Sequence, residues 1–269
     1  MTKIGKKIAV VTGASSGMGR KFCEILDNEG FEEIWGLGLG KDAMEDVKKS
    51  LKTKFRYFDM DLTAQENLAV YKQALEEAKP DVQWLVNCSG FGKFGRYDEI
   101  PVETSMNMVD LNCRALLFMT ETTLPFMHEG GRIVQIASVA GFQPIPFIAV
   151  YGATKAFVIS YSRALNVELK TRGISVTTVC PFWTKTAFFD RAKKIKAKQS
   201  QEVVSKYVVM YDPEKVIKKA YRDATKRKEV SIYGVVARSQ VRLVKLIPTK
   251  WTMGIWMKQQ KLKQKYEGK

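Results

Sequence analysis

The sequence predicts an α/β protein in which one doubly wound parallel sheet forms a single domain. Three observations support this class. Six apolar runs of strand length recur between residues 7 and 180, helical patterns separate them, and no Pro/Gly-rich linker, repeat or low-complexity segment divides the chain. Several of the runs are apolar nearly throughout, as expected of strands that helices cover on both faces. At 269 residues, the chain is long enough to bury a substantial core.

The first half of the chain alternates strand and helix patterns. We expect a strand over 7–12, a glycine-rich turn, and a helix over 18–30 in which Met18, Phe22, Ile25 and Leu26 have helical spacing. A strand over 33–38 then precedes a helix over 42–51, for which Asp42 is the expected N-cap. A third strand is expected over 55–60, and a helix near 63–78 ends before Pro80.

The same alternation continues to residue 180. A fourth strand is predicted over 82–87, a long helix from Glu103 towards Met127, and a fifth strand over 131–138. A helix over 150–173, ending at Gly173, and a sixth strand over 174–180 complete the pattern. We assign residues 1–230 to the α/β domain and residues 231–269 to a basic amphipathic C-terminal extension.

Charge is distributed unevenly along the chain. The net charge is +16, and residues 1–185 hold 22 basic and 21 acidic residues, whereas residues 186–269 hold 22 basic and 7 acidic residues. A basic end suits nucleic acid, an anionic membrane surface or an acidic substrate carrier, or it is a solvated surface that raises solubility. No recognised binding module accompanies the charge, so we expect no nucleic-acid partner.

The ionisable and sulfur-containing residues exclude several classes of site. The four cysteines, Cys23, Cys88, Cys113 and Cys180, lack metal-ligand spacing, and His128 is the single histidine. We therefore expect neither a metal site nor a Ser-His triad, and free thiols are typical of a reducing compartment. No signal peptide is evident and no apolar run is long enough to span a bilayer, so we expect a cytoplasmic protein.

The turn "TGASSGMG" (12–19) lies between the first predicted strand and helix, where a dinucleotide-binding fold holds a pyrophosphate. Gly13 permits a tight exit from the strand. Gly17 and Gly19 let backbone amides and the N-terminus of the helix approach the phosphates. The context of this turn, with alternating units after it, predicts phosphate binding.

Later motifs extend this signal, and together they make the chain resemble the short-chain dehydrogenase/reductase family over roughly residues 5–190. "TGASSGMG" matches the family's glycine turn, and "DMDL" places Asp61 where the family contacts adenine. "VNCSG" (86–90) matches with departures at Cys88 and Ser89, and "CPFWTKT" (180–186) matches with Phe182 in place of glycine. "LNCRA", "IASVAG" and "YGATK" supply Asn112, Ser138, Tyr151 and Lys155. The resemblance implies a Rossmann-like fold and a nicotinamide cofactor.

The spacing of Tyr151 and Lys155 suits acid–base chemistry on a carbonyl. Hydride transfer to a ketone builds negative charge on its oxygen, which must receive a proton. A lysine one helical turn from a tyrosine favours the phenolate and should lower the pKa of the phenol. By resemblance, Tyr151 exchanges the proton, Ser138 binds the substrate oxygen, Lys155 also holds the nicotinamide ribose, and Asn112 anchors a water that relays protons.

The cofactor preference is read after the second strand, at "WGLGLGKD". Leu39 occupies the position that usually decides between the ribose 2′-OH of NAD and the 2′-phosphate of NADP. No acid there repels a phosphate and Lys41 is close, so we expect NADP, with NAD as the alternative. The expected cofactor-binding residues are Gly13, Ser15, Ser16, Gly17, Met18, Gly19, Leu39, Lys41, Asp61, Leu62, Asn87, Ser89, Gly90, Tyr151, Lys155, Pro181, Thr184 and Thr186.

Aromatic residues dominate the expected substrate side. The expected substrate-binding residues are Phe91, Ser138, Phe142, Tyr151, Phe182, Trp183 and Phe188. They predict an apolar, bulky substrate such as a steroid or lipid, as a hydroxysteroid dehydrogenase-like member would use. A 3-ketoacyl thioester reductase is an alternative enzyme, and a nucleotide-binding regulator without turnover is the alternative outside enzymes.

The last forty residues interleave basic and apolar side chains. From Arg238 onward there are nine basic residues and one acidic residue, and as a helix the end of the chain would place Trp251, Ile255, Leu262 and Tyr266 along one side. Such a segment suits the plane of a membrane interface, which would bring residues 235–269 to the inner face of a membrane. The alternatives are a lid over the substrate cleft and an oligomer contact in a homodimer or homotetramer.

Overall fold

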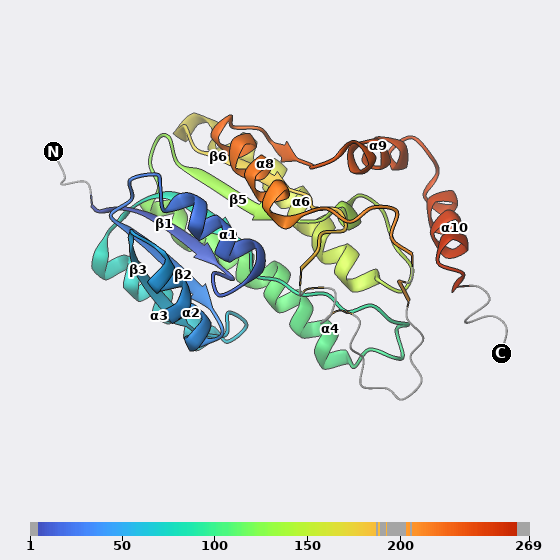
Figure 1. Ribbon diagram of the computed structural model, residues 1–269, viewed down its shortest axis with the longest axis horizontal. Helices are drawn as coiled ribbons and strands as arrows, with labels where there is room; N and C mark the ends of the chain where they lie inside the picture. Colours follow the sequence, from blue (N-terminus) through green and yellow to red (C-terminus); the bar gives the residue numbers. More distant parts are fainter. Residues whose placement is uncertain (1–4, 187, 189–191, 193–202, 205, 263–269) are drawn as a thin grey trace.

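A seven-stranded parallel sheet forms the centre of the chain (Figure 1). The computed structural model describes residues 5–186, 188, 192, 203–204 and 206–262. The strands run in the order β3-β2-β1-β4-β5-β6-β7, so the chain winds outward from β1 in both directions. Their bounds are β1 Lys7–Thr12, β2 Glu33–Gly38, β3 Lys54–Asp59, β4 Asp81–Asn87, β5 Arg132–Ile136, β6 Ser175–Val179 and β7 Val230–Ser231. The predicted doubly wound fold is confirmed, and the two-residue β7 is the one strand of the sheet that was not predicted.

Helices cover both faces of the sheet. One face packs against α1 (Gly17–Leu26), α2 (Lys41–Ser50) and α8 (Pro213–Thr225), and the other against α3 (Gln65–Ala78), α5 (Leu116–Thr123) and α6 (Ala149–Glu168). Alternation along β1 shows the two layers, because Ile8 and Val10 belong to one hydrophobic cluster and Ala9 and Val11 to the other. Both faces are therefore buried, which explains the uninterrupted apolar strands.

Two helix predictions need correction. Asp42 is not the N-cap of α2: it lies in the first turn, and Gly40, with φ of 105°, is the N-cap residue. The helix expected from Glu103 to Met127 is not continuous. It consists of α4 (Val102–Val109), a π-helical segment over Asp110–Ala115, α5, and a 3₁₀ turn over Leu124–Phe126. The π segment carries Asn112, and such segments are often found at functional sites.

The C-terminal part forms two helices at one end of the molecule, α9 (Val235–Val244) and α10 (Thr249–Gln259) (Figure 1). Ala237 of α9 belongs to a buried cluster with Val158 and Ile159 of α6 and with Cys180, which follows β6. Trp256 of α10 donates a hydrogen bond from Nε1 to the Pro146 oxygen, at 3.0 Å. Both helices are thus held against the main body.

The face expected for the C-terminal segment is partly wrong. Trp251 and Ile255 share the exposed side of α10, but Leu262 lies beyond the helix end and is buried. Tyr266, Lys263 and Lys265 lie outside the described residues. Among the helices of the described ranges, none is long and apolar enough to cross a membrane.

Candidate active site

The glycine turn joins β1 to α1 in the predicted place. Gly13 and Gly17 have positive φ angles of 67° and 54°, a conformation that favours glycine. At Gly19, a Cβ atom would lie 2.2 Å from the Gly13 oxygen, so only glycine permits this close crossing of turn and helix. The turn is therefore built by the residue types that the sequence singled out.

The start of α1 fits an anionic group. The side chain of the N-cap residue, Ser16, makes no capping hydrogen bond, and the first turn holds no acidic residue. Helix N-termini attract phosphates through their free backbone amides and the helix dipole. Ser15 is half-buried and Ser16 is exposed at this turn, and Met18 lines the large cavity described below. The residues present can therefore hold a dinucleotide pyrophosphate.

Of the residues expected to bind the adenosine half of the cofactor, Leu39 and Lys41 have exposed side chains and Leu62 has a buried one. Leu39 and Lys41 are exposed at the end of β2, where the Gly40 amide donates a hydrogen bond to Asp59 Oδ1, at 2.9 Å. Asp61 Oδ1 accepts hydrogen bonds from the Thr63 amide and hydroxyl, at 2.9 and 2.8 Å. The expectation that Leu62 binds the cofactor needs correction for its side chain. That side chain is buried in the core, so only the backbone of Leu62 can face a ligand.

The end of β4 is fixed against the glycine turn. Thr12 Oγ1 accepts hydrogen bonds from the amides of Cys88 and Ser89, at 2.9 and 3.0 Å. The Asn87 side chain points into the protein, where its Nδ2 donates to Thr120 and Gln135, both at 3.0 Å. Asn87 therefore supports the site from the core rather than with an exposed amide.

Asn112 connects three parts of the site through its side-chain amide. Its Oδ1 accepts from the Phe91 amide at 3.0 Å, and its Nδ2 donates to the Phe91 oxygen at 2.9 Å and to Thr154 Oγ1 at 3.0 Å. Since Thr154 lies on α6 beside the Tyr-Lys pair, Asn112 fixes the loop after β4 relative to that helix. Asn112 is itself buried.

Ser138 and Tyr151 approach one another from different elements. Ser138 follows β5 as N-cap of a 3₁₀ turn, and its Oγ accepts from the Ala140 amide at 3.1 Å. Tyr151 lies in the first turn of α6, is buried, and shares a side-chain hydrogen bond with Ser138. The two hydroxyls thereby lie together in the lining of the cavity described below.

Lys155 lies one turn further along α6 and is also buried. Its Nζ donates to the Ile136 oxygen at 2.8 Å and lies 5.7 Å from the centroid of the Tyr151 ring. Burial lowers the pKa of Lys155 to about 8. The Lys155 ammonium therefore loses its proton at a pH only slightly above neutral.

The expected lowering of the Tyr151 pKa is wrong for this structure. Burial raises the pKa of Tyr151 to about 12, and the hydrogen bond from Ser138 offsets only part of that rise. Desolvation opposes the charged phenolate more strongly than the neighbouring groups favour it. Tyr151 consequently holds its proton at neutral pH.

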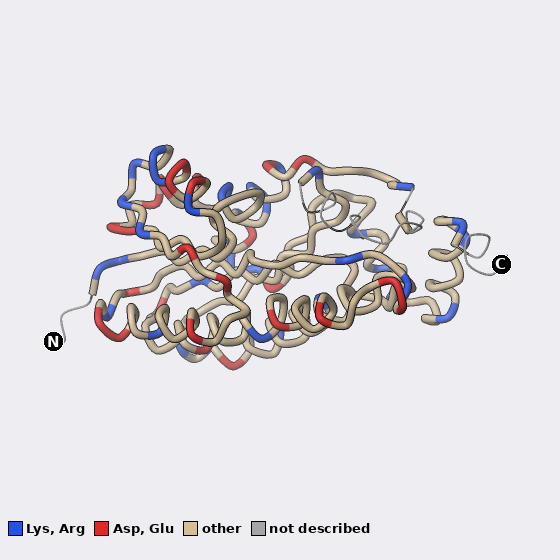
Figure 2. The backbone as a smooth tube through the Cα atoms, turned by 90° about the horizontal axis from the view of Figure 1, so that it is seen from below, with Lys and Arg blue, Asp and Glu red and all other residues tan. Residues whose placement is uncertain are grey.

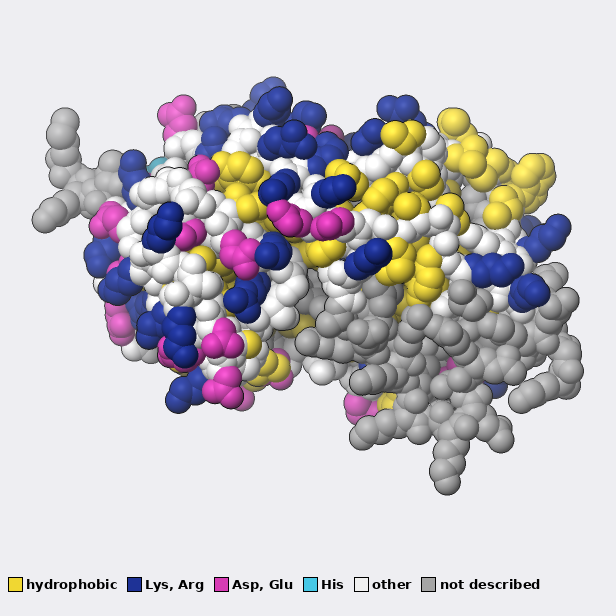
Figure 3. All heavy atoms as spheres, viewed as in Figure 1, with side chains coloured by type: hydrophobic (Ala, Val, Ile, Leu, Met, Phe, Trp, Pro, Cys, Tyr) yellow, Lys and Arg dark blue, Asp and Glu magenta, His cyan; other side chains and the backbone are white. Residues whose placement is uncertain are grey.

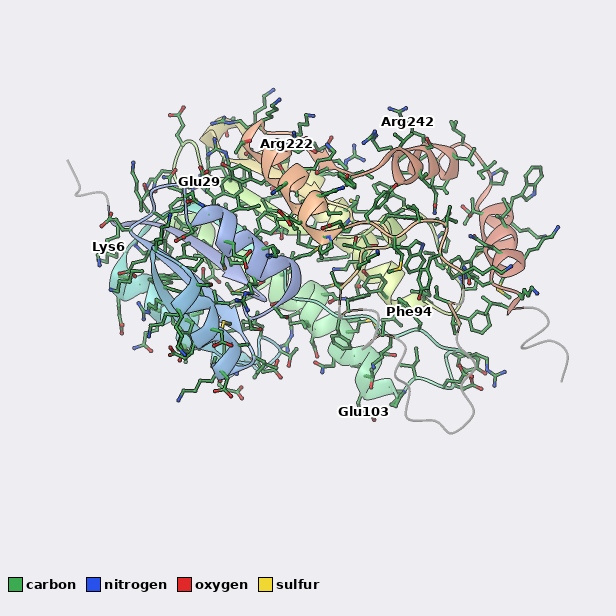
Figure 4. All side chains as sticks on the ribbon, viewed as in Figure 1. Lys6, Glu29, Phe94, Glu103, Arg222 and Arg242 are labelled. Atoms are coloured by element: carbon green, nitrogen blue, oxygen red, sulfur yellow. The ribbon has the colours of Figure 1, made fainter. Side chains whose placement is uncertain are left out.

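One cavity of about 590 Å³ brings many of the predicted residues together. Its lining includes, of the predicted residues, Met18, Gly90, Ser138, Tyr151, Lys155, Pro181, Phe182, Trp183, Thr184, Thr186 and Phe188. The remaining lining is mostly apolar and includes Phe94, which Figure 4 labels, and Ile145. A cavity with this lining suits an apolar ligand whose polar group lies against the polar end of the cavity.

Two predicted substrate contacts do not line this cavity. Phe142 packs against another cluster, and Lys245 Nζ lies 5.3 Å from the centroid of its ring. Phe91 has its backbone held by Asn112 and lies outside the lining. The aromatic content of the sequence could not distinguish residues that pack behind the wall from those that form it.

A lid over the substrate cleft was one alternative for the C-terminal segment, but its lining residues were not predicted, nor was one close contact at Gly92. Residues of α9 and α10, among them Val236, Leu243 and Trp256, line the cavity, and the apolar positions of the C-terminal segment were the available signal. At Gly92, a Cβ atom would lie 2.8 Å from the Tyr151 ring and 2.9 Å from Phe188, so a glycine lets the two rings sit there. Nothing in the spacing of Gly92 indicated this. Within the described ranges, no group of three or more His, Cys, Asp or Glu residues could hold a metal ion.

Comparison with known proteins agrees with this geometry. The family model described as short chain dehydrogenase matches residues 7–197. An uncharacterized oxidoreductase of Staphylococcus epidermidis is 30% identical over 211 residues, which cover 76% of this chain and 91% of the relative. The very-long-chain 3-oxoacyl-CoA reductase-B of Danio rerio is 30% identical over 188 residues, which cover 67% of this chain and 60% of the relative.

Solved structures share the fold. A short-chain dehydrogenase from Sphingobium yanoikuyae, solved in complex with NADPH, superposes with a TM-score of 0.73 at 26% sequence identity. The match covers 87% of this chain and 91% of that one. The likeness therefore extends over most of both chains.

Proposed function

This chain belongs to the short chain dehydrogenase family and is an NAD(P)-dependent oxidoreductase, and from that premise we propose that it interconverts a secondary hydroxyl and a ketone on an apolar, bulky substrate such as a steroid or lipid. The observation that carries the proposal is the cavity of about 590 Å³, with Ser138, Tyr151 and Lys155 at one place in its lining and mostly apolar side chains elsewhere. Such a lining favours a carbonyl on an apolar skeleton over a sugar or an amino acid.

The proposed proton transfer uses the Tyr151 hydroxyl. When bound, a nicotinamide dinucleotide would supply the hydride for the carbonyl carbon. The substrate oxygen takes the proton of Tyr151, with Ser138 as its second hydrogen-bonding partner, and the O–H bond of the tyrosine breaks as that of the alcohol forms. The raised pKa of Tyr151 keeps the proton in place until the oxygen gains charge. The Lys155 ammonium then stabilises the phenolate that remains.

We propose NADP as the preferred cofactor, with NAD as the alternative. The glycine turn would hold the pyrophosphate, and Gly90, Pro181, Thr184 and Thr186, which were expected to bind the cofactor, are among the residues that line the cavity. Leu39 is exposed and carries no charge that would repel a 2′-phosphate, and Lys41 follows two residues later. The NADPH complex of the Sphingobium relative supports the same preference.

A 3-ketoacyl thioester reductase is the second candidate. The Danio rerio relative carries the name of a 3-oxoacyl-CoA reductase, and the basic side chains of α9 and α10 near the cavity could meet the phosphates of such a thioester. A non-catalytic, nucleotide-binding regulator is less consistent with a site that holds Asn112, Ser138, Tyr151 and Lys155 together.

One assay separates these functions. NADPH and NADH oxidation is measured with steroid ketones, ketoacyl thioesters and small aldehydes. The proposal expects turnover of bulky apolar ketones, with NADPH preferred. Turnover confined to thioesters would favour the second candidate. Dinucleotide binding without turnover of any of these carbonyls would contradict both enzyme proposals and favour the regulator.

We also propose that residues 231–262 cover the substrate and that the protein is a cytoplasmic homodimer or homotetramer. The lining by α9 and α10 supports the first part. The exposed apolar side chains Met106 of α4 and Phe157 of α6 offer a contact surface, and the free thiols suit a reducing compartment. Light scattering gives the mass of the particle, and a monomer at micromolar concentration would contradict the assembly.

A further inference from the structure

The end of the molecule formed by α9 and α10 exposes a group of apolar side chains, which we call the apolar rim. Its seven members are Val208, Val235, Val236, Leu243, Leu246, Trp251 and Ile255, all of them exposed. Leu246 and Trp251 are 83% and 65% exposed, unusually high values for a leucine and a tryptophan. Clusters of this kind on a protein surface mark interaction sites more often than single exposed residues do.

Basic side chains surround the apolar rim. Between residues 230 and 262 the sequence has six basic residues and no Asp or Glu; the six are Arg238, Arg242, Lys245, Lys250, Lys258 and Lys261. Figure 3 shows hydrophobic side chains gathered at this end, with Lys and Arg beside them, and in Figure 2 the helix nearest the C-terminus carries blue but no red. Arg242 extends outward from α9 (Figure 4). Apolar groups with cations around them are complementary to an anionic lipid surface.

The apolar rim is also the mouth of the catalytic cavity. Five of its members, Val208, Val235, Val236, Leu243 and Ile255, line the cavity although they are exposed. The same side chains therefore face both the surrounding medium and the space that ends at Tyr151. An apolar molecule leaving a bilayer at this place would pass along apolar side chains without crossing bulk water.

We propose that this end of the protein docks on an anionic membrane surface through the apolar rim, and that the substrate enters the cavity from the lipid. The docking part stands independently of the enzymatic activity. The entry part rests on the proposed function, because it identifies the substrate as an apolar ketone or alcohol that partitions into membranes. The contact is peripheral: Leu246 and Trp251 insert among the acyl chains, and the lysines and arginines pair with lipid phosphates.

Vesicle flotation with the full chain tests the docking. Vesicles contain phosphatidylcholine alone or phosphatidylcholine mixed with phosphatidylglycerol. We expect binding to the anionic vesicles, loss of binding at high salt, and at least about tenfold weaker binding for L246D or for the pair R242E and K258E. V167D on α6 and K226E after α8 are matched controls, since both sites are exposed and neither belongs to the apolar rim or to the C-terminal helices. Controls that weaken binding as much as the rim variants, or wild-type protein that stays unbound, would overturn the docking.

Trp251 gives a second readout, because Trp35, Trp84 and Trp256 are buried and Trp183 is half-buried. Its emission should shift to the blue on anionic vesicles and be quenched by brominated acyl chains, and W251F should lose most of both signals. A different result would contradict the membrane proposal: light scattering shows that L246D and W251F convert an oligomer to monomers, and vesicles leave the Trp251 emission unchanged. The apolar rim would then be a contact between copies of the chain.

Substrate entry is tested with a ketone that the enzyme reduces. L246D should lower the rate for a ketone held in vesicles, in proportion to its lost binding, far more than the rate for a water-soluble ketone, since Leu246 lies outside the cavity lining. Equal rates of wild type and L246D on the vesicle-held ketone would refute entry from the lipid. If no ketone is reduced but anionic vesicles still bind, the proposed function fails and the docking stands.

Discussion

Lys155 Nζ lies 5.7 Å from the centroid of the Tyr151 ring, and its hydrogen bond goes to the carbonyl oxygen of Ile136. The lysine is thus anchored to the end of β5 by the sheet backbone while it stays beside the phenol. Both groups are buried, and burial acts on them in opposite directions: it raises the pKa of Tyr151 to about 12 and lowers that of Lys155 to about 8. Near neutral pH, Tyr151 is therefore an uncharged acid, and Lys155 beside it is a cation that loses its proton more easily than an ordinary lysine.

Replacing Tyr151 by Phe removes the proton donor but keeps the ring that packs against Phe94 and Phe188. We expect kcat for ketone reduction to fall roughly 100- to 10,000-fold, the usual contribution of general acid–base catalysis, with little change in cofactor affinity. Steady-state kinetics and cofactor titration by fluorescence measure the two effects. Y161F, ten positions further along α6 and outside the cavity lining, is the matched control. Unchanged turnover in Y151F would remove Tyr151 from the mechanism.

The rate of reduction should depend on the protonation of Lys155. Because burial places its pKa at about 8, the cation that stabilises the developing Tyr151 phenolate is present below that pH and is lost above it. We therefore expect kcat for reduction to be level on the acidic side and to decline as pH rises through about 8. Tyr151 itself stays protonated in this range, since its pKa is about 12. K155M should show a low rate without this decline, and a wild-type profile that stays level well above pH 8 would contradict the assignment.

Asn112 should matter for stability as well as for activity. Asn112→Ala leaves the amide and carbonyl of Phe91 and the hydroxyl of Thr154 without their partner. We expect the free energy of unfolding to fall by about 1–3 kcal/mol, as for other buried groups that lose a hydrogen bond. Denaturant titration measures this loss. T154V removes one of the three contacts, together with the hydrogen bond that Thr154 Oγ1 donates to the Tyr151 oxygen at 2.8 Å, and should cost less. An N112A protein as stable as the wild type would show that the loop is held by other means.

Local motifs allowed the sequence to predict most of the site. The glycine turn and the Tyr151–Lys155 spacing are set by neighbouring residues on one element, and the order of strands and helices then brings Ser138 and Asn112 to them. Features that depend on distant packing were not predictable. The π segment at Asn112 has the same apolar pattern as an α-helix, and Phe142 differs from Phe188 only in which side of a wall it occupies. The sequence left a lid over the cleft as one of several alternatives for the C-terminal segment, and which side chains of α9 reach the cavity depends on how this segment packs against the main body.

Cofactor preference should respond to position 39, because Leu39 is exposed at the end of β2, with Lys41 exposed nearby. In L39D the new carboxylate would repel a 2′-phosphate and accept a hydrogen bond from a ribose 2′-OH. We expect the ratio of kcat/KM for NADPH to that for NADH to fall at least about tenfold, and to rise in L39R. V70D, at an exposed position on α3, is the control. If the ratio moves in neither variant, the ribose is bound elsewhere.

The environment of Glu33 lets us predict how the stability of the fold changes as the pH falls. Its side chain is 8% exposed. Burial alone would raise its pKa, but hydrogen bonds from Trp35, Lys54 and Lys6 outweigh burial and lower it to about 2, from an ordinary value of 4.5. A carboxyl group whose pKa is lower in the folded state stabilises the fold above its ordinary pKa, and the stabilisation disappears as pH falls from about 4.5 towards 2.

The variant E33Q isolates this effect. We expect it to lower the free energy of unfolding by about 1–3 kcal/mol near neutral pH, because Trp35 Nε1 and the two lysines lose a charged partner. The difference from the wild type should shrink as pH falls below about 4.5, where the wild-type carboxylate also becomes protonated on unfolding. Denaturant titrations over this pH range measure both, with E66Q at an exposed site of α3 as control. A destabilisation that stays constant with pH would mean that the shape of the side chain, and not its charge, supports the start of β2.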